Sequence, residues 1–332
     1  MKPEAGWYPV RLEARPGGSA VLYWQNLASV DFSEPFFEDT MRYHRGGYPL
    51  LRTEFPAEDF PVLPPPVLPA ALIFHASRSG STLLTQYISC LPGGFGLSEP
   101  PVIDDVLQAS LPDEMKITLL RHVVHALCQR RSQDDRYFIL KHDSWHLPWL
   151  PLLQQAFPGM PCWFIYRRPE EILRSHYRQR GSHMVPGLRD SAPLGILPGS
   201  FDPADLDGYA ALVLESVFAL AMQHVSNGFL LPLEYRRLAQ DPVGVLLKMG
   251  LPLTSTEEAI IRDRSCFHSK RTGEAFHPNY DATLPSSAWL ARVHDLIMPR
   301  LSALYENLSA MAPPTPATRD TIPAVNASRA IL

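Results

Sequence analysis

The sequence predicts an α/β fold in which helices flank both faces of a parallel β-sheet, preceded by a small N-terminal α+β appendage. Three observations carry this prediction. From residue 70 onward, short apolar runs alternate with amphipathic stretches, which is the rhythm of β-α-β units. The first apolar run, residues 71–76, leads into a polar loop and then a helical pattern, a geometry typical of anion sites. Apolar residues make up 45% of the 332, enough for a sizeable core.

We expect residues 1–65 to form the appendage. Residues 7–24 are predicted to be a β-hairpin, because two extended runs flank the turn sequence Pro16-Gly17-Gly18-Ser19. A helical run follows Ser33-Glu34-Pro35, where proline is tolerated in the first turn. The proline-rich stretch over residues 61–69 is then expected to be stiff and extended. A lid, a dimer contact and a partner-docking piece all remain open as roles for this appendage.

Residues 66–311 are predicted to form the main domain, and residues 312–332 a disordered tail. The expected strands span 71–76, 95–98, 137–141, 161–167 and 229–234, and the expected helices span 36–43, 81–89, 102–107, 112–130, 149–157, 169–180, 204–226, 237–249, 256–262 and 287–311. Residues 181–203 are rich in glycine and proline without periodicity, as in a lid or substrate loop. Ligands of such folds bind at the carboxyl ends of the strands.

Composition narrows the classes of function. A net charge of −4 and a pI near 6.3 argue against nucleic acid as a partner. The four cysteines lack metal-site spacing, so we expect buried free thiols. Residues 1–6 lack the apolar core of a signal peptide, and the most apolar helix, residues 209–225, is too short for a bilayer. We therefore expect a cytoplasmic, soluble protein without a membrane partner; a homo-oligomer is left open.

The loop after the first strand is rich in hydrogen-bond donors: Ser77, Arg78, Ser79, Gly80, Ser81 and Thr82. An ordinary polar turn would not require so many. Gly80 lacks the Cβ that would block close approach of an anion, and Arg78 adds a fixed positive charge. A triphosphate loop would carry glycine at the place of His75 and lysine at the place of Ser81. The sequence therefore predicts an anion site without the usual arrangement for a Mg²⁺-bound triphosphate.

A second motif lies near the middle of the chain, where Phe164-Ile165-Tyr166-Arg167-Arg168-Pro169 ends a strand and opens a helix. Ser175 follows Arg167 by eight positions (175 − 167), so an arginine at the strand end and a serine two turns into the helix can converge on one phosphate. The alternative is a solvated strand end that pairs with Glu170 or Glu171.

Together the two motifs resemble those of the sulfotransferases, over roughly residues 70–310. Ser77 to Leu84 is similar to that family's Pro-Arg-Ser-Gly-Thr-Thr-Leu-Leu loop, which holds the 5′-phosphosulfate of 3′-phosphoadenosine 5′-phosphosulfate (PAPS). Arg167 and Ser175 match its 3′-phosphate pair. Two looser matches are Tyr235, which would lie by the adenine, and a basic loop that would close on the 3′-phosphate, with Lys270, Arg271 and Gly273.

The resemblance implies transfer of a sulfuryl group from PAPS to a hydroxyl or amine of a small-molecule or biosynthetic acceptor, releasing 3′-phosphoadenosine 5′-phosphate (PAP), with no metal. Arg78 would stabilise charge on the donor, and Lys141 matches the family's strand-end lysine near the sulfuryl group. For the general base we rank Glu99 first, Asp143 second and His142 third. The structural alternative for Glu99 is a carboxylate that caps the helix after Pro100.

Two other classes of function remain open. A small-molecule kinase with a degenerate P-loop would need Mg²⁺ and ATP, and the missing lysine argues against it. A non-catalytic nucleotide-binding module would dock a partner through residues 1–65, and the set of Arg78, Glu99 and Lys141 argues against it. The acceptor does not follow from the sequence, but residues 181–203, with His183 and Met184, and the appendage are its expected determinants.

Overall fold

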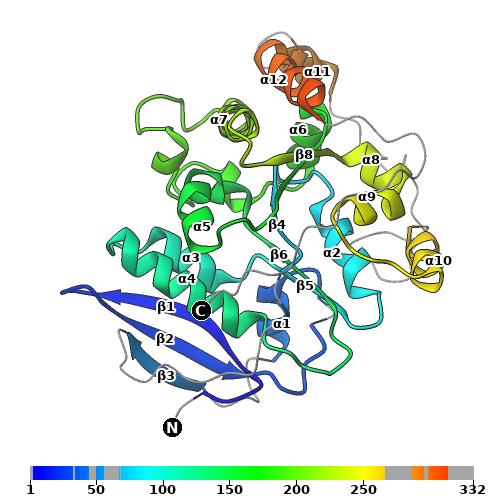
Figure 1. The fold of residues 1–332 in the computed structure, drawn as a ribbon. Coiled ribbons are helices and arrows are strands. Elements are labelled where there is room, and N and C mark those ends of the chain that lie inside the picture. Colours follow the sequence, from blue (N-terminus) through cyan, green and yellow to red (C-terminus); the bar gives the residue numbers. More distant parts are fainter. Residues whose placement is uncertain are drawn as a thin grey trace.

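The computed structural model describes residues 3–32, 34–44, 50–55, 67, 69–265, 286–294 and 298–312 (Figure 1). Within these ranges it contains a five-stranded parallel sheet with helices on both faces and a three-stranded antiparallel sheet near the N-terminus. This architecture confirms the predicted fold class. Most of the proline-rich connector and nearly all of the C-terminal tail lie outside the described residues.

The central sheet places one loop at its topological switch point. Its strands are β4 (Ala71–His75), β5 (Gly94–Ser98), β6 (Tyr137–Lys141), β7 (Cys162–Tyr166) and β8 (Leu231–Glu234), in the order β5-β6-β4-β7-β8 with every pair parallel. The chain leaves β4 on one side to form β5 and β6, and later returns to its other side as β7. The carboxyl end of β4 is therefore the place where this class of fold binds ligands.

Both faces of the sheet are buried, as the apolar strands predict. In β4, Leu72 and Phe74 join one hydrophobic cluster and Ala71 and Ile73 the other, because side chains alternate between the faces. The larger cluster is covered by α3 (Pro101–Gln108), α4 (Asp113–Leu127), α5 (Leu150–Ala156), α7 (Leu206–Ser226) and α12 (Met298–Met311). The smaller is covered by α2 (Ser81–Ser89), α8 (Tyr235–Gln240), α9 (Pro242–Lys248) and α10 (Ser255–Arg264). Helix α6 (Pro169–Arg178) follows β7, and α11 (Ser287–Arg292) precedes α12.

The N-terminal sheet packs beside α3 and α4, at one end of the molecule (Figure 1). Its strands are β1 (Trp7–Arg15), β2 (Ser19–Asn26) and β3 (Leu50–Phe55), with α1 (Phe37–Tyr43) between β2 and β3. The hairpin and helix confirm the sequence prediction, but β3 was not predicted. The backbone N–H of Leu12 donates to Asp105 of α3, and the side chain of Gln129 bonds the backbone of both Gly6 and Trp7. The apolar side chains of this sheet belong to the same cluster as α3 and α4.

Some helix boundaries differ from those expected. The helix predicted over 237–249 is two helices, because the carboxylate of Asp241 accepts from the N–H of Gly244 and Pro242 starts a new helix. The helix predicted over 149–157 is preceded by a 3₁₀ segment, η1 (Ser144–Trp149). The helix predicted over 287–311 is described as α11 and α12, with residues 295–297 outside the described ranges.

Helix α7 corrects the expectation that the most apolar helix is too short for a bilayer. It has 21 residues, its most apolar window of 18 residues has a mean hydropathy of 1.3, and by length and composition it could cross a membrane. Half of this window is buried inside the protein, where Leu214 and Phe218 pack in the larger cluster. Cys90, Cys128 and Cys162 are free thiols, as predicted, and Cys266 lies outside the described residues.

Candidate active site

The loop between β4 and α2 has a strained backbone. Ser77 and Arg78 have φ angles of 53° and 45°, and Gly80, the N-cap of α2, has a φ of 86°. Such angles are uncommon outside glycine and gather at functional sites. The hydroxyl of Ser79 donates to the carbonyl of Ile165 at 2.8 Å and so fastens the loop to β7. We call residues 77–82 the anion loop, because it leads straight into the N-terminus of α2.

Arg78 reaches away from the loop toward the end of α6. Its Nη2 donates to the carbonyl of Gln179 at 2.9 Å. Burial lowers the pKa of the Arg78 guanidinium, while the negative charge of Glu99 opposes this shift. Ser81 and Thr82 are buried in the first turn of α2. The predicted donors are thus gathered at one end of the sheet.

Tyr235 lies directly against the anion loop. A Cβ on Gly80 would fall far inside van der Waals contact with ring carbons Cδ2 and Cε2 of Tyr235. The guanidinium of Arg167 lies 4.8 Å from the centroid of the same ring, a cation–π contact. The structure therefore brings together three residues that the sequence assigned to the nucleotide.

Arg167 also makes the ion pair that the structural alternative predicted. Its Nε lies 2.6 Å from Oε2 of Glu171, one helical turn along the start of α6. Ser175 is half-buried on α6, two turns beyond the strand end that carries Arg167. Lys270, Arg271 and Gly273, the predicted closing loop, lie outside the described residues.

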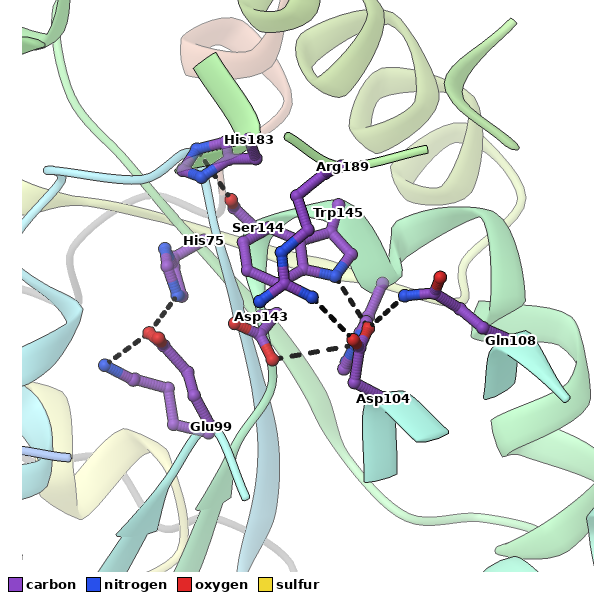
Figure 2. Close-up of polar contacts among 11 residues, drawn as sticks. His75, Glu99, Asp104, Gln108, Asp143, Ser144, Trp145, His183 and Arg189 are labelled. Carbon is purple, nitrogen blue, oxygen red and sulfur yellow. Dashed lines mark hydrogen bonds and ion pairs between the residues drawn. The ribbon is translucent and has the colours of Figure 1, made fainter. Parts of the chain in front are cut away.

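Glu99, Lys141 and His75 meet at the carboxyl ends of three adjacent strands, β5, β6 and β4. Nζ of Lys141 lies 2.8 Å from Oε1 of Glu99, and Nε2 of His75 lies 3.2 Å from the same oxygen (Figure 2). Lys141 is 1% exposed and the Glu99 side chain 21%. The ring of Phe36, from the segment before α1, lies 4.7 Å from Nζ of Lys141. The predicted base and the predicted strand-end lysine are therefore in direct contact.

The carboxylate of Glu99 is ionised in this arrangement. Burial alone would raise the pKa of Glu99, but the charge of Lys141 and the hydrogen bond from His75 lower it well below its usual range. The structural alternative of a helix cap is wrong, because Pro100 holds the N-cap position of α3 and the carboxylate faces Lys141 and His75. The backbone of Glu99 has a φ of 55°, a second strained point beside the anion loop.

The other two candidate bases, Asp143 and His142, are both buried, and burial shifts their pKa values in opposite directions. Burial, together with the charges of Glu99 and Asp104, raises the pKa of Asp143 well above its usual range. Burial lowers the pKa of His142 well below its usual range. The ring of His142 stacks on Phe74 at a centroid distance of 4.8 Å, and neither of its nitrogens has a hydrogen-bond partner among the described residues. Of the two candidate carboxyl groups, Glu99 is the one whose pKa is lowered.

A further network around Asp104 was missed by the sequence analysis. Oδ1 of Asp104 accepts from Gln108, Trp145 and His146 at 2.6, 2.7 and 2.8 Å, and Oδ2 pairs with Arg189 at 2.8 Å (Figure 2). Burial would raise the pKa of Asp104, but the hydrogen bond from His146 and the donors beside it lower it to about 2. The signal in the sequence was the polar run directly after β6, which includes Trp145 and His146.

The same network fastens the loop over residues 181–203 across the site. Arg189 lies 4.5 Å from the centroid of Trp145, in addition to its ion pair with Asp104. Nε2 of His183 lies 3.2 Å from the hydroxyl of Ser144, and burial lowers the pKa of His183 to about 3. The loop contains two short 3₁₀ segments, η2 (Ser182–Met184) and η3 (Ala192–Leu194). It therefore lies against Ser144 and Trp145, which follow β6, and its role as a lid or substrate loop stays a prediction.

Asp104, Asp143 and His146 offer ligand atoms within 4.8 Å of one another, a spacing that a metal ion could bridge. However, both oxygens of Asp104 already accept from cationic or N–H donors, and the raised pKa of Asp143 disfavours its charged form. These residues therefore fit a hydrogen-bonded network better than a cation site.

No family model and no curated protein matches the chain. Solved structures that align with the chain include the following three. The sulfotransferase domain of the Synechococcus PCC 7002 olefin synthase aligns with a TM-score of 0.40 and 17% identity, covering 75% of this chain and 97% of that domain. The sulfotransferase domain from the curacin biosynthetic pathway aligns with a TM-score of 0.43 and 17% identity, covering 74% of this chain and 99% of that domain. Sulfotransferase STF1 from Mycobacterium tuberculosis H37Rv aligns with a TM-score of 0.39 and 14% identity, covering 74% of this chain and 78% of that protein.

Proposed function

We propose that the protein transfers a sulfuryl group from PAPS to a hydroxyl or amine of a small-molecule or biosynthetic acceptor and releases PAP. The observation that carries this proposal is the pair of Lys141 and Glu99, whose side chains meet at 2.8 Å beside the anion loop. An anion site and an ionised base at one edge of a parallel sheet are what an in-line displacement needs. The sequence motifs are the reason that we propose transfer of a sulfuryl group and not of a phosphoryl group.

The donor would lie along the anion loop and the start of α6. Backbone N–H groups of the loop and the N-terminus of α2 would bind the 5′-phosphosulfate, with Arg78 adding charge. Arg167 and Ser175 would bind the 3′-phosphate, and the ring of Tyr235 would lie by the adenine. The packing of Tyr235 on Gly80 and of Arg167 on Tyr235 supports this, because it makes the proposed adenine site contiguous with the two proposed phosphate sites.

In the chemical step the sulfur–oxygen bond to the 5′-phosphate breaks while a bond from sulfur to the acceptor oxygen or nitrogen forms. The proton of the acceptor passes to the carboxylate of Glu99. Lys141 would stabilise the negative charge that develops on the leaving phosphate oxygen. Loss of one such donor commonly costs about 2.7–4 kcal/mol of transition-state stabilisation. Asp143 and His142 would have supporting roles, since burial raises the pKa of Asp143 and the ring of His142 is stacked on Phe74.

The acceptor would enter between the loop over residues 181–203 and the N-terminal segment. The loop contributes His183 and Arg189, and the segment contributes Phe36, which lies against Lys141. Both were expected to determine the acceptor. With a net charge of −4, we favour a small molecule in the cytoplasm over a nucleic acid or a membrane surface.

Thermal unfolding with PAP, ATP·Mg²⁺ and ADP, measured side by side, tests the donor. We expect PAP to raise the melting temperature selectively, because a ligand that binds only the folded state stabilises it by RT ln(1 + L/Kd), where L is the concentration of free ligand. A preference for ATP·Mg²⁺ would instead support the small-molecule kinase. The same assay is applied to Arg167→Ala, which removes a residue of the proposed 3′-phosphate site. Its matched control is Arg262→Ala, which loses an exposed ion pair on α10.

Glu99→Gln tests the base. Release of PAP from PAPS, followed across a panel of alcohols, phenols and amines, should be abolished, while the dissociation constant for PAP stays nearly unchanged. The amide cannot take up the acceptor proton, yet it still fills the space beside Lys141 and His75. Turnover retained by this variant would move the base to Asp143.

A further inference from the structure

His75 occupies a place that the mechanism above does not use. It is the last residue of β4, is 5% exposed, and stands where a triphosphate loop would carry its first glycine. Its two ring nitrogens face different parts of the site. The backbone N–H of Ser77 donates to Nδ1 at 3.0 Å, and Nε2 lies 3.2 Å from Oε1 of Glu99. One imidazole therefore bridges the first residue of the anion loop and the proposed base.

The hydrogen bond to Ser77 fixes the tautomer of this ring. A backbone N–H can only donate, so Nδ1 must carry the lone pair, and in the neutral ring the hydrogen is on Nε2. Nε2–H then donates to the carboxylate of Glu99. A proton added at Nδ1 would break the bond from Ser77. The ring is therefore suited to hold two groups in place and unsuited to carry protons between them.

Both of the groups that His75 holds have strained backbones. Ser77 has a φ of 53° and Glu99 a φ of 55°, angles that non-glycine residues rarely adopt without support from their surroundings. The bond to Nδ1 is made by the strained Ser77 itself, at the start of the loop. The bond from Nε2 is made to the strained Glu99. His75 thus contacts both strained points from the end of β4.

Several charged or titratable groups act on the Glu99 carboxyl. Lys141 pairs with the same oxygen that His75 contacts, and Arg78, Asp143 and His183 lie close enough to interact with Glu99 electrostatically. Of these, His75 is the one whose ring also bonds the backbone of the anion loop.

We propose that His75 is a positioning residue for both the donor site and the base: neutral, with its hydrogen on Nε2, it holds the Ser77 amide through one ring nitrogen and the Glu99 carboxylate through the other. The names "donor site" and "base" rest on the proposed function. The two positioning contacts rest on the two hydrogen bonds.

Two substitutions separate the two bonds. His75→Asn places an amide oxygen where Nδ1 stood, so it can accept from Ser77 but is too short to reach Glu99. His75→Gln extends an amide N–H toward Glu99 but offers no acceptor at the Nδ1 position. The same two changes at His125, on the half-buried side of α4, are matched controls.

Two measurements read the two bonds in the full-length protein. The dissociation constant for PAP, from isothermal titration calorimetry, reports the anion loop. The pKa of Glu99, from carbon NMR of protein labelled at the glutamate carboxyl carbons, reports the base, with Glu99→Gln identifying the signal. We expect His75→Asn to raise the pKa of Glu99 and to leave PAP binding within about twofold. We expect His75→Gln to keep the pKa near that of wild type and to weaken PAP binding about threefold to tenfold, the effect of one lost hydrogen bond.

The proposal is overturned if both variants change both readouts alike, which would indicate a merely structural role, or if neither readout changes. Wild-type protein that does not bind PAP would contradict the proposed function, while the titration of Glu99 in the two variants would still decide the bond from Nε2. If neither variant folds, long-range nitrogen NMR of the wild-type imidazole decides. A ring with hydrogen on Nε2 supports the proposal, and one with hydrogen on Nδ1 overturns it.

Discussion

The ring of Tyr235 lies against the backbone of Gly80, at the junction of the anion loop and α2. The contact is so close that no side chain fits between them, since even a Cβ would collide with Cδ2 and Cε2. Gly80 also has a φ of 86°, which non-glycine residues rarely adopt. Two independent constraints therefore require glycine at this position. The contact joins α8 to the loop. It places Tyr235, which we propose lies by the adenine, beside the proposed phosphate site.

Gly80→Ala should destabilise the protein and weaken PAP binding. The left-handed backbone alone costs an alanine about 1–2 kcal/mol. Displacement of the Tyr235 ring should add about 1–3 kcal/mol, as for overpacking elsewhere. Urea unfolding measures the loss of stability, and isothermal titration calorimetry measures the loss of affinity for PAP.

Gly187→Ala is the matched control for this substitution. Gly187 has a φ of 78°, and a Cβ there would meet nothing within 4 Å, so it carries the backbone cost without the collision. Equal destabilisation by the two changes would show that the Tyr235 contact has no energetic weight. The double variant Gly80→Ala/Tyr235→Ala should recover part of the stability that Gly80→Ala loses.

Arg167→Ala should weaken PAP binding about 10- to 100-fold, the range for loss of charge-assisted hydrogen bonds. Adenosine 5′-phosphate, which lacks the 3′-phosphate, should bind the variant and the wild type alike. Arg262→Ala, which breaks an ion pair of the same spacing with Glu258, should change neither affinity. If the variant still distinguishes the two nucleotides as wild type does, the 3′-phosphate site lies elsewhere.

Asp143→Asn should stabilise the protein more at neutral pH than at pH 4. The folded-state pKa of Asp143 is raised, so the folded protein keeps a proton that the unfolded chain releases once the pH exceeds about 3.8. The free energy of unfolding of the wild type therefore falls as the pH rises from this value toward the raised pKa. Asparagine has no such proton and removes that loss. Urea unfolding at the two pH values measures the difference, and an equal effect at both would contradict the raised pKa.

The same variant separates the candidate bases. The pKa of Asp143 is raised whereas that of Glu99, the proposed base, is lowered, so Asp143→Asn should retain turnover, measured as release of PAP. Complete loss of turnover in a variant that binds PAP normally would move the base from Glu99 to Asp143.

The sequence predicted the central sheet well because its three middle strands are buried on both faces. In β4, β6 and β7 this burial requires continuous apolar runs, which stand out from the amphipathic helices around them. Strand β3 was not predicted, since most of its residues are exposed or half-exposed and its pattern is weak. The break between α8 and α9 was missed because Asp241-Pro242 was not taken as a helix start.

The site could be predicted only where its residues follow strand ends. Glu99 and Lys141 were expected near the anion loop because β5 and β6 end there, and the structure places them in contact. The Asp104 network could not be predicted, because it joins a helix to a loop without periodicity through Arg189. The role of His75 depends on which atom each ring nitrogen faces, and no spacing in the sequence encodes that.

Arg189→Ala should loosen the loop over residues 181–203 without unfolding the protein. Arg189 pairs with Asp104 at 2.8 Å and lies over Trp145 at 4.5 Å, but its side chain is 40% exposed, so both contacts are partly screened by solvent. We expect the global free energy of unfolding to fall by less than about 1 kcal/mol. Hydrogen exchange at the amides of Met184 and Leu194, which bond within the loop, should become several-fold faster. PAP binding should stay unchanged, because the contacts of Arg189 described here are with Asp104 and Trp145 and not with the anion loop.

Arg300→Ala, which removes an exposed ion pair with Glu215, is the matched control and should leave exchange at the amides of Met184 and Leu194 unaltered. Unchanged exchange in Arg189→Ala would show that His183 and the apolar side chains of the loop hold it in place without the arginine.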